Sequence, residues 1–352
     1  MDFTIYSVGT FMERCYSRIA GLHKRGGVRI ICPSGAHWEV TDYHRGVCGR
    51  SRIDKRPISD VLLGRCLVTW NGKLDGYREV VAAAQQHGMR TAFFEYGWFS
   101  GMLQLDGTGV NAESSLMHFP ADWFSDYPIA SPGAIWGADF KQRPIEFGAK
   151  DMLPGDVSLP DGCIFFPMQL DNDTQITMHS PHYKSMRDVL ADIVPAIPTG
   201  MTLLVKEHPS IRDQGIYGAM RDEFPSIVWC RTTPIDTILA SASLAITVNS
   251  SVGFQAMCRK LPLVVLGNAV YGKAGLCITR EYGKTIAKLI AVALGEAPDH
   301  ELRERFLCFV KERHLVPYVF SSMYQRIANI ADGKMPWFDR DWSGAYDKAE
   351  QS

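Results

Sequence analysis

The chain has 352 residues, of which 46% are hydrophobic and 21% are charged, and its formal net charge is −1. A chain of this size can bury one large or two medium cores, and two domains are the better expectation. The near-zero net charge provides no general field that would attract nucleic acid or an anionic membrane surface, so neither is expected as a binding partner.

The cysteines and the N-terminus indicate the compartment. Nine cysteines are scattered without a CxxC pair and mostly in apolar surroundings, as expected of reduced thiols in a core. The opening residues MDFTIYSVGTF lack the layout of a signal peptide. No apolar run approaches the roughly 18 residues of a membrane helix. These features predict a cytoplasmic protein without a transmembrane segment.

Short apolar strands alternate with segments of helical length along the whole chain. In the first half, strands are predicted at 2–7, 28–32, 66–70 and 90–94, with helices at 11–24 and 74–87. In the second half, strands are predicted at 163–168, 202–206, 227–230, 243–248 and 262–266, with helices at 183–194, 234–242, 251–259, 283–294 and 299–312. This alternation is typical of an α/β fold with parallel sheets.

The middle of the chain separates two domains. Residues 128–162 hold five prolines and several glycines without clear periodicity, which is the composition of a connection. We therefore predict two Rossmann-like domains around a central cleft, at 1–150 and 151–315, followed by a helix and tail at 316–352. Such sheets bind ligands beyond the carboxyl ends of their strands, so motifs at strand ends are the candidate sites.

The most unusual strand end is CIFFPMQLDNDTQITMHSPHY, residues 163–183. A buried strand opens into polar residues that include Gln169, Asp171 and Asp173. Aspartates in such a loop often cap turns, which is the structural alternative to a catalytic role. His179 and His182 follow, but the proline between them prevents a shared helical face and no third ligand is evident, so a metal site is not expected.

Two further strand ends suit a phosphate. Lys206 and His208 lie in LLVKEHPS, where a surface turn with a solvated Lys–Glu pair is the alternative. Asn249, Ser250 and Ser251 lie in AITVNSSVGFQAM, where backbone N–H groups and the positive end of a helix can bind an anion. Simple helix capping is the commoner role of a serine pair, but two such strand ends in one domain favour a phosphate site.

A glycine-rich loop follows the next strand. The sequence LVVLGNAVYGKAGL places Gly267, Asn268 and Tyr271 after it. Glycine permits close approach of the backbone to a ligand, and a tyrosine can stack on a base. Taken alone, this is an ordinary glycine loop.

In the first half, a strand delivers Glu95 to its carboxyl end beside Tyr96 and Trp98. Aromatic rings beside a carboxylate suit a sugar-binding cleft, because sugars present apolar C–H faces that stack on rings. The alternative is that Trp98 only covers the edge of the sheet.

The four motifs together, in this order and spacing, resemble the bacterial capsule polysaccharide biosynthesis family that includes the retaining β-Kdo glycosyltransferases. Kdo is the acidic sugar 3-deoxy-D-manno-oct-2-ulosonic acid. The resemblance covers roughly residues 90–280. It implies a GT-B fold, a CMP-β-Kdo donor bound mainly by the C-terminal domain, a glycan or glycolipid acceptor bound mainly by the N-terminal domain, and no cofactor or metal. It further implies a C-terminal helix packing back on the N-terminal domain and peripheral association with a polysaccharide assembly complex at the cytoplasmic face of the inner membrane.

The resemblance also assigns roles to residues. It implies that Asp173 is the nucleophile of a double displacement and that Gln169 orients it, with Asp171 as the rival carboxylate. Glu95 is the expected general base for the acceptor hydroxyl. Gln255 stands where many GT-B enzymes have a glutamate near the ribose, and its amide can still bind hydroxyls. The remaining donor-site residues are Lys206, His208, Asn249, Ser250, Ser251, Gly267, Asn268 and Tyr271.

Two other classes stay open. CDP-glycerol-type phosphotransferases also combine a His-Pro strand end with a Ser-Ser helix start, but they typically carry an acidic residue and a tyrosine where this chain has Val248 and Asn249. A non-catalytic assembly factor with the same fold is the second alternative.

Overall fold

The computed structural model describes residues 2–7, 27–34, 37–44, 47–48, 52–140, 151–211, 214–283 and 285–339. By its internal contacts the chain divides into two units, which we describe separately. Unit 1 comprises Met1–His118 and Val310–Ser352, and unit 2 comprises Phe119–Phe309. The helix predicted at 11–24 and the last part of the C-terminal tail lie outside the described residues.

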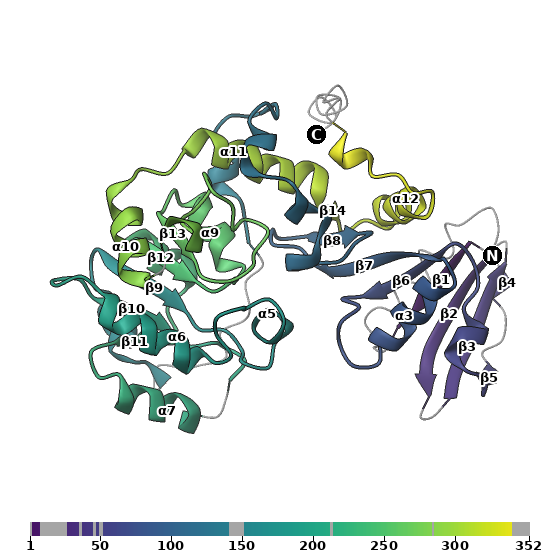
Figure 1. Cartoon of the computed structure of the whole chain (residues 1–352), viewed down its shortest axis with the longest axis horizontal. Coiled ribbons are helices and arrows are strands. Elements are labelled where there is room, and N and C mark those ends of the chain that lie inside the picture. The colour runs from purple at the N-terminus through teal and green to yellow at the C-terminus, as the bar shows by residue number, and fades with distance from the viewer. Residues whose placement is uncertain are drawn as a thin grey trace. The chain divides into compact units, whose positions relative to one another are not determined.

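The four strands predicted in the first half are all confirmed, and they form the parallel centre of the sheet of unit 1 (Figure 1). They are β2 (Gly27–Ser34), β1 (Phe3–Tyr6), β6 (Cys66–Trp70) and β7 (Arg90–Tyr96), in that spatial order. Antiparallel strands, which were not predicted, extend this parallel centre on both sides. These are β3 (His37–His44), β4 (Val47–Cys48), β5 (Arg52–Asp54), β8 (Met102–Asp106) and β14 (Val316–Pro317).

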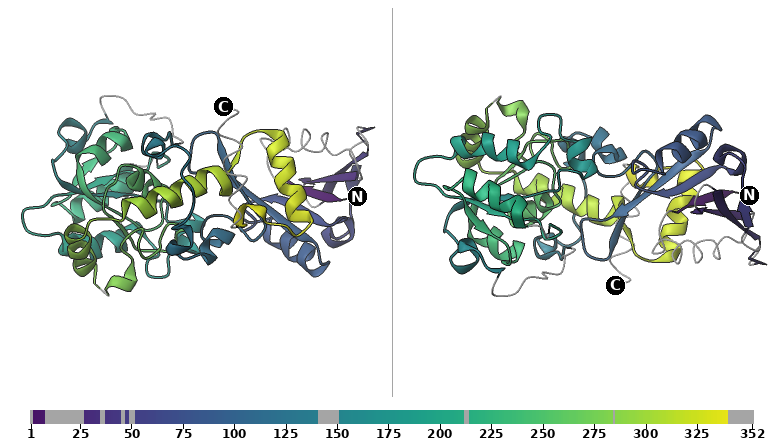
Figure 2. Two further views of the ribbon diagram at one scale, coloured as in Figure 1. Left: turned by 90° about the horizontal axis from the view of Figure 1, so that it is seen from above. Right: turned by 90° about the horizontal axis from the view of Figure 1, so that it is seen from below.

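Alternating residues of the central strands bury against helices on opposite faces of this sheet. Tyr6 faces a cluster with α2 (Ile58–Val61) and α3 (Arg78–Gln86), whereas Ile5 faces a cluster with α12 (Phe320–Ala331). Figure 2 shows α12 lying across the strands. Because successive side chains of a strand point to opposite faces, helices cover both sides of the sheet, and unit 1 has three layers.

A buried polar network lies beyond the end of β8. The Asp106 carboxylate accepts hydrogen bonds from the Ser114 hydroxyl at 2.9 Å and the Ser115 N–H at 3.0 Å. The Ser114 hydroxyl also lies 3.2 Å from Nε2 of His314, which ends the π-helical turn η8 (Val310–His314). Residues 111–113 and 115–118 form the short 3-10 helices η1 and η2 that position these serines. Burial lowers the pKa of His314 from 6.5 to about 4, so the ring is neutral at physiological pH.

This pKa predicts acid sensitivity of unit 1. An unfolded chain binds a proton at the His314 ring near pH 6.5, and the folded chain binds it only near pH 4. The folded protein is therefore most stable above pH 6.5, and it loses about 3 kcal/mol of stability as the pH falls toward 4. Urea unfolding of wild type and His314→Gln between these pH values should show a shallower loss of stability in the variant. His87→Gln, at the exposed residue that follows α3, is the control and should keep the wild-type slope. Equal slopes for wild type and His314→Gln would refute the assignment.

The five strands predicted in the second half are confirmed and form one parallel sheet in unit 2. Its order is β11 (Val228–Cys230), β10 (Leu203–Lys206), β9 (Cys163–Pro167), β12 (Ala242–Thr247) and β13 (Leu263–Val265). Helices connect the strands: α4 (Pro154–Val157), α5 (Thr174–Thr177), α6 (Met186–Ile193), α7 (Gln214–Glu223), α8 (Ile235–Ser241), α9 (Val252–Cys258), α10 (Ile286–Gly295) and α11 (His300–Phe309).

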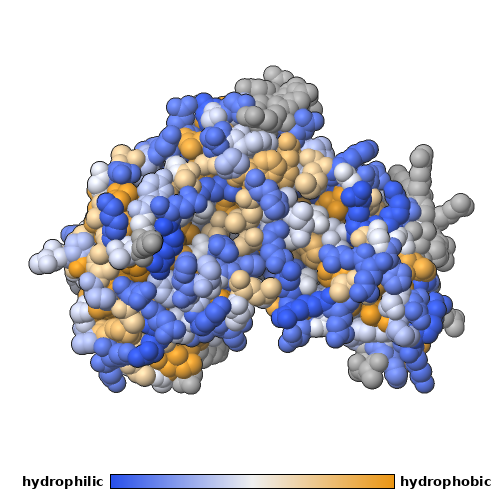
Figure 3. Space-filling model, in the orientation of Figure 1, coloured by the Kyte–Doolittle hydropathy of each residue, from blue (hydrophilic) through white to orange (hydrophobic). Residues whose placement is uncertain are grey.

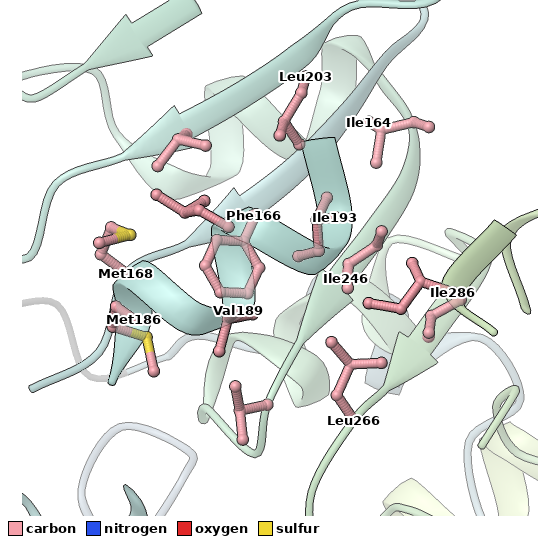
Figure 4. Packing of buried hydrophobic residues seen from close by; sticks show 14 of the residues in the cluster. Ile164, Phe166, Met168, Met186, Val189, Ile193, Leu203, Ile246, Leu266 and Ile286 are labelled. Atoms are coloured by element: carbon pink, nitrogen blue, oxygen red, sulfur yellow. The ribbon is translucent and has the colours of Figure 1, made fainter. Parts of the chain in front are cut away.

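Both faces of this sheet are covered. Figure 4 shows Ile164, Phe166 and Ile246 of the strands packed with Val189 and Ile193 of α6 and with Ile286 of α10. On the opposite face, α8 and α9 lie against β9, β12 and β13. Every residue of α9 is buried, which explains why its sequence is apolar apart from Gln255.

Residues 119–137 belong to unit 2, so the boundary between the contact-defined units falls before the expected limit at 150. Their 3-10 helices η3 (Ala121–Phe124) and η4 (Ala134–Gly137) pack on α11. Arg259 fixes η4 by donating a hydrogen bond to the Trp136 carbonyl at 2.8 Å. Trp123 and Phe124 of η3 also pack against the rings of Phe309 and Phe306 of α11. These contacts fix the proline-rich stretch on unit 2.

Among the described residues, no helix has both the length and the apolar character needed to cross a bilayer. In Figure 3, hydrophilic residues cover much of the visible face, and apolar residues are scattered among them. The seven cysteines whose side chains are described form no disulfide, and six of them are buried.

Candidate active site

The parallel sheet of unit 2 brings its candidate motifs to one edge. Neighbouring strands β10, β9, β12 and β13 end at Lys206, Pro167, Thr247 and Val265. Because parallel strands share their direction, the polar segments that follow all emerge from the same edge. The topology therefore assembles segments that are separated by as much as a hundred residues of sequence.

A pair of buried amides ties two of these segments together. The Gln169 Nε2 donates to Asn249 Oδ1 at 2.9 Å, and the Asn249 backbone N–H donates back to Gln169 Oε1 at 3.3 Å. The Asn249 Nδ2 also donates to the carbonyls of Gln175 and His179, at 2.7 Å and 3.2 Å. Gln169 and Asn249 are 8% and 6% exposed. They therefore fix the loop after β9 on the end of β12.

Asp173 lies in this fixed loop and caps α5. Its Oδ1 accepts from the Gln175 N–H at 2.9 Å and from the Thr174 hydroxyl at 3.3 Å. Its Oδ2 accepts no hydrogen bond from the described residues. The expected hydrogen bond from Gln169 to Asp173 is absent, because the Gln169 amide is engaged by Asn249. One oxygen thus anchors an exposed carboxylate and leaves the other available for a reaction.

Asp171, the rival carboxylate, has a different environment. Its Oδ1 accepts from the Met186 N–H at 2.7 Å, at the start of α6. Burial raises the pKa of this carboxyl above its ordinary value. Asp171 therefore ties the loop after β9 to the start of α6.

Lys206 and Glu207 are structural. The Lys206 ammonium donates to the carbonyls of Arg231 and Thr233 at 2.6 Å and 2.7 Å, and burial lowers its pKa. Glu207 is 2% exposed and pairs with Arg221 and, at 2.6 Å, with Arg231. Lys206 is therefore turned into the protein, which contradicts the expectation that it neutralises a ligand phosphate.

His208, the next polar residue of this motif, is held by two contacts. It is half-buried, its backbone N–H donates to the Tyr217 hydroxyl at 2.8 Å, and its Nδ1 accepts from the Ser210 N–H at 3.2 Å. Because Nδ1 is the acceptor, the neutral ring carries its proton on Nε2. The imidazole is thus held as an Nε2–H donor.

The turn before α9 is built by Tyr271. Its hydroxyl donates to the Ser250 carbonyl, and its ring packs edge-on against Phe254 with centroids 4.9 Å apart. Tyr271 is 1% exposed, and a Cβ at Gly253 would overlap its ring. The expectation that Tyr271 stacks on a base is thus wrong, because the ring is buried where it supports the Ser250–Ser251 turn.

The remaining predicted donor-site residues frame this turn. Ser251 is exposed, and the Ser250 hydroxyl accepts from the Val252 N–H at 3.3 Å. Gly267 is required by packing, since a Cβ there would lie 2.8 Å from Val248 Cγ1. Asn268 is exposed, and its N–H donates to the His179 carbonyl at 2.9 Å. Gln255, on α9, is 8% exposed.

One element of the site was not anticipated from the sequence. Asp156, in the proline-rich connection, accepts from the N–H groups of Arg231, Thr232 and Thr233 at 2.7–2.8 Å. It thereby fixes the turn after β11, which also supplies the carbonyls for Lys206. Only Pro154, the first residue of α4, signals a helix start there, and nothing in the sequence indicates the partner of the carboxylate.

In unit 1, Glu95 ends up beside Asn71 on the neighbouring strand end. Asn71 Nδ2 donates to Glu95 Oε2 at 3.1 Å, and the Tyr96 N–H donates to Glu95 Oε1 at 2.9 Å. Trp98 is 8% exposed and stacks on the ring of His314, with centroids 6.0 Å apart. Trp98 therefore covers the buried network, and the expectation that it lines a sugar site is wrong.

No group of three or more His, Cys, Asp or Glu side chains within the described ranges is arranged to hold a metal ion. His182 contacts Tyr183 edge-on, with centroids 6.5 Å apart. His179 is instead tied to the loop through its carbonyl, which accepts from Asn249 and Asn268.

The fold is that of a GT-B-like protein, as two solved structures show. Thermosulfurimonas dismutans KpsC, beta Kdo 2,7 transferase, is 13% identical with a TM-score of 0.54, covering 94% of this chain and 99% of that one. The structure titled KpsC, beta Kdo 2,4 transferase, from the same organism is 11% identical with a TM-score of 0.52, covering 93% and 98%. The predicted α/β architecture of two Rossmann-like domains is thus confirmed.

Sequence comparison shows which protein family and which individual proteins the chain resembles. Residues 157–309 match the family model described as capsule polysaccharide biosynthesis protein, which confirms the resemblance inferred from the motifs. Protein FixF of Sinorhizobium fredii is 30% identical over 261 residues, which are 73% of this chain and 61% of FixF. Capsule polysaccharide export protein KpsS of Escherichia coli is 29% identical over 120 residues, or 31% of each chain. The chain therefore spans less than two thirds of these relatives.

Proposed function

We propose that the protein is a retaining glycosyltransferase that moves Kdo from CMP-β-Kdo to a glycan or glycolipid acceptor in surface polysaccharide biosynthesis. The observation that carries the proposal is the Gln169–Asn249 amide pair, which joins the loop of Asp173 to the turn of Ser250 and Ser251. A nucleophile and an anion-binding turn on one rigid edge are what transfer from a nucleotide sugar requires. The family match and the KpsC-like fold agree with this chemistry.

In the proposed reaction, Asp173 Oδ2 attacks the anomeric carbon of the donor. The bond from that carbon to the phosphate oxygen breaks, and CMP departs with the electron pair, leaving Kdo esterified to Asp173. The acceptor hydroxyl oxygen then displaces the carboxylate while Glu95 takes the hydroxyl proton. Two inversions give net retention, as in retaining glycosidases.

The donor phosphate is proposed to lie at His208 and the Ser250–Ser251 turn. His208 presents Nε2–H, and Ser251 is exposed at the start of α9. These neutral donors stabilise the negative charge that develops on departing CMP. Gln255 and Asn268 are the proposed contacts to the nucleoside hydroxyls and base, and Lys206, Asn249, Gly267 and Tyr271 support them from within the protein.

A donor assay tests the proposal against its alternatives. CMP-β-Kdo, generated in situ, and CDP-glycerol are offered with a lipid-linked glycan extract, and release of CMP is measured. We expect CMP release from CMP-β-Kdo only. Release from CDP-glycerol would identify a phosphotransferase, and binding of glycan without release from either donor would identify a non-catalytic assembly factor.

Glu95→Gln should lower the transfer rate about 100-fold or more, because the amide cannot accept the acceptor proton. CMP affinity should stay within about twofold of wild type, since Glu95 belongs to unit 1 and the donor residues to unit 2. Transfer kinetics and calorimetric titration of CMP separate the two effects. Glu79, an exposed residue of α3 in the same unit, provides the matched control: Glu79→Gln should behave as wild type. Unchanged transfer by Glu95→Gln would exclude Glu95 as the base.

A further inference from the structure

Unit 1 carries an aromatic corner in which only Glu95 has a proposed catalytic role. It consists of Trp70, Asn71, Glu95 and Tyr96, at the carboxyl ends of the neighbouring strands β6 and β7 (Figure 1). The rings of Trp70 and Tyr96 meet edge to face, with centroids 4.9 Å apart and planes at 72°. Tyr96 is 42% exposed, and Trp70 is half-buried against the core. A large aromatic pair at the surface is therefore held in a fixed geometry.

The backbone between the strands is shaped to hold the polar half of this corner. Asn71 has a positive φ of 51°, a conformation that asparagine tolerates better than most residues. Its N–H donates to the Phe94 carbonyl of β7 at 2.8 Å. Gly72 follows with a φ of 83°, and a Cβ there would overlap the Phe93 ring. The turn thus places the Asn71 amide against Glu95 independently of any ligand.

The resulting chemistry suits one class of ligand. An aromatic ring binds the apolar C–H face of a pyranose, and a carboxylate beside an amide binds vicinal hydroxyls. The Glu95 carboxylate also disfavours a second carboxylate at the same place. A neutral pyranose can stack on the ring, bind the carboxylate and amide through its hydroxyls, and avoid repulsion by Glu95. An acidic sugar can do the first two but is repelled by Glu95.

We propose that the Trp70–Tyr96 corner binds a neutral pyranose ring, by stacking on the aromatic pair and by hydrogen bonds from ring hydroxyls to Glu95 and Asn71. The inference rests on the proposed transferase function only in identifying this ring as part of the acceptor. Trp70 and Tyr96, at the ends of adjacent strands, thus take the sugar-stacking role that was expected of Trp98. The ring of Trp98 is covered by the core.

The test is saturation-transfer NMR without any nucleotide sugar. The probes are methyl β-D-glucopyranoside, methyl α-D-mannopyranoside and the methyl glycoside of Kdo. At least one neutral glycoside should give signals from the C–H groups of one ring face, and the Kdo glycoside should bind more weakly. Tyr96→Ala should reduce binding about tenfold, and Tyr96→Phe should retain it because the ring remains.

Tyr318→Ala is the matched control, since Tyr318 lies in the same unit, is 41% exposed and also packs beside another ring, that of Phe320. It should bind the probes as wild type does. Equal binding by Tyr96→Ala, equal loss in Tyr318→Ala, a preference for the Kdo glycoside, or no binding of either neutral probe would each overturn the proposal. Because no donor is present, failure of the transfer chemistry leaves this result unchanged.

Discussion

Asp173→Asn should fold, bind CMP and lose transfer by about a thousandfold or more, the scale seen when a covalent nucleophile is removed. The amide keeps the size of the side chain and an oxygen that can accept from the Gln175 N–H, so the cap of α5 should survive. What it lacks is the anionic Oδ2 that would attack the anomeric carbon. Transfer from CMP-β-Kdo, thermal unfolding and CMP titration measure these three properties.

Asp171→Asn is the matched control for this variant. It lies two residues away, and its carboxylate is engaged by the Met186 N–H. It should keep most of the transfer activity and lose at most about 1–2 kcal/mol of stability. Near-normal turnover by Asp173→Asn would remove the covalent mechanism, and loss of activity in Asp171→Asn alone would identify the other carboxylate as the nucleophile.

His208→Ala should weaken CMP binding about 10- to 100-fold and reduce transfer at least as much, because it removes the proposed Nε2–H donor to the phosphate. His208→Gln keeps a donor of similar reach and should recover part of the loss. Calorimetric titration with CMP and with cytidine separates the phosphate from the nucleoside, since cytidine affinity should change little in either variant.

His182→Ala is the control for the phosphate site. His182 is exposed and its ring contacts Tyr183, so its loss should leave CMP binding near that of wild type. If His208→Ala binds CMP as tightly as wild type and transfers normally, the phosphate lies elsewhere on the sheet edge.

The sequence predicts the sheet of unit 2 well because each of its strands is a short, mostly apolar run. In β9, Cys163 through Pro167 are all buried. Such a run between helical segments has few alternatives to a parallel strand. Strand β3 was not predicted, because HWEVTDYH lacks such a continuous apolar run. Its alternation of polar and apolar residues is typical of an antiparallel strand with one solvated face.

Side-chain roles at the strand ends were harder to predict, because a motif does not show which way a side chain points. Lys206 and Tyr271 stand beside the candidate site in the sequence, yet one binds backbone carbonyls and the other lies in the core. The partnership of Gln169 with Asn249 joins residues 80 positions apart, so local spacing carries no sign of it. Glu95 and its partner Asn71 likewise meet only through the pairing of β6 with β7.

Intact-protein mass spectrometry with CMP-β-Kdo in the absence of acceptor tests the covalent role of Asp173 most directly. Glu95→Gln is the preferred enzyme, because loss of the base should slow the second displacement more than the first and so accumulate the intermediate. The account predicts a mass increase of one Kdo residue that maps to Asp173 after proteolysis and is missing from Asp173→Asn. An enzyme that transfers Kdo without ever showing this adduct, or an adduct that maps to Asp171, would contradict it.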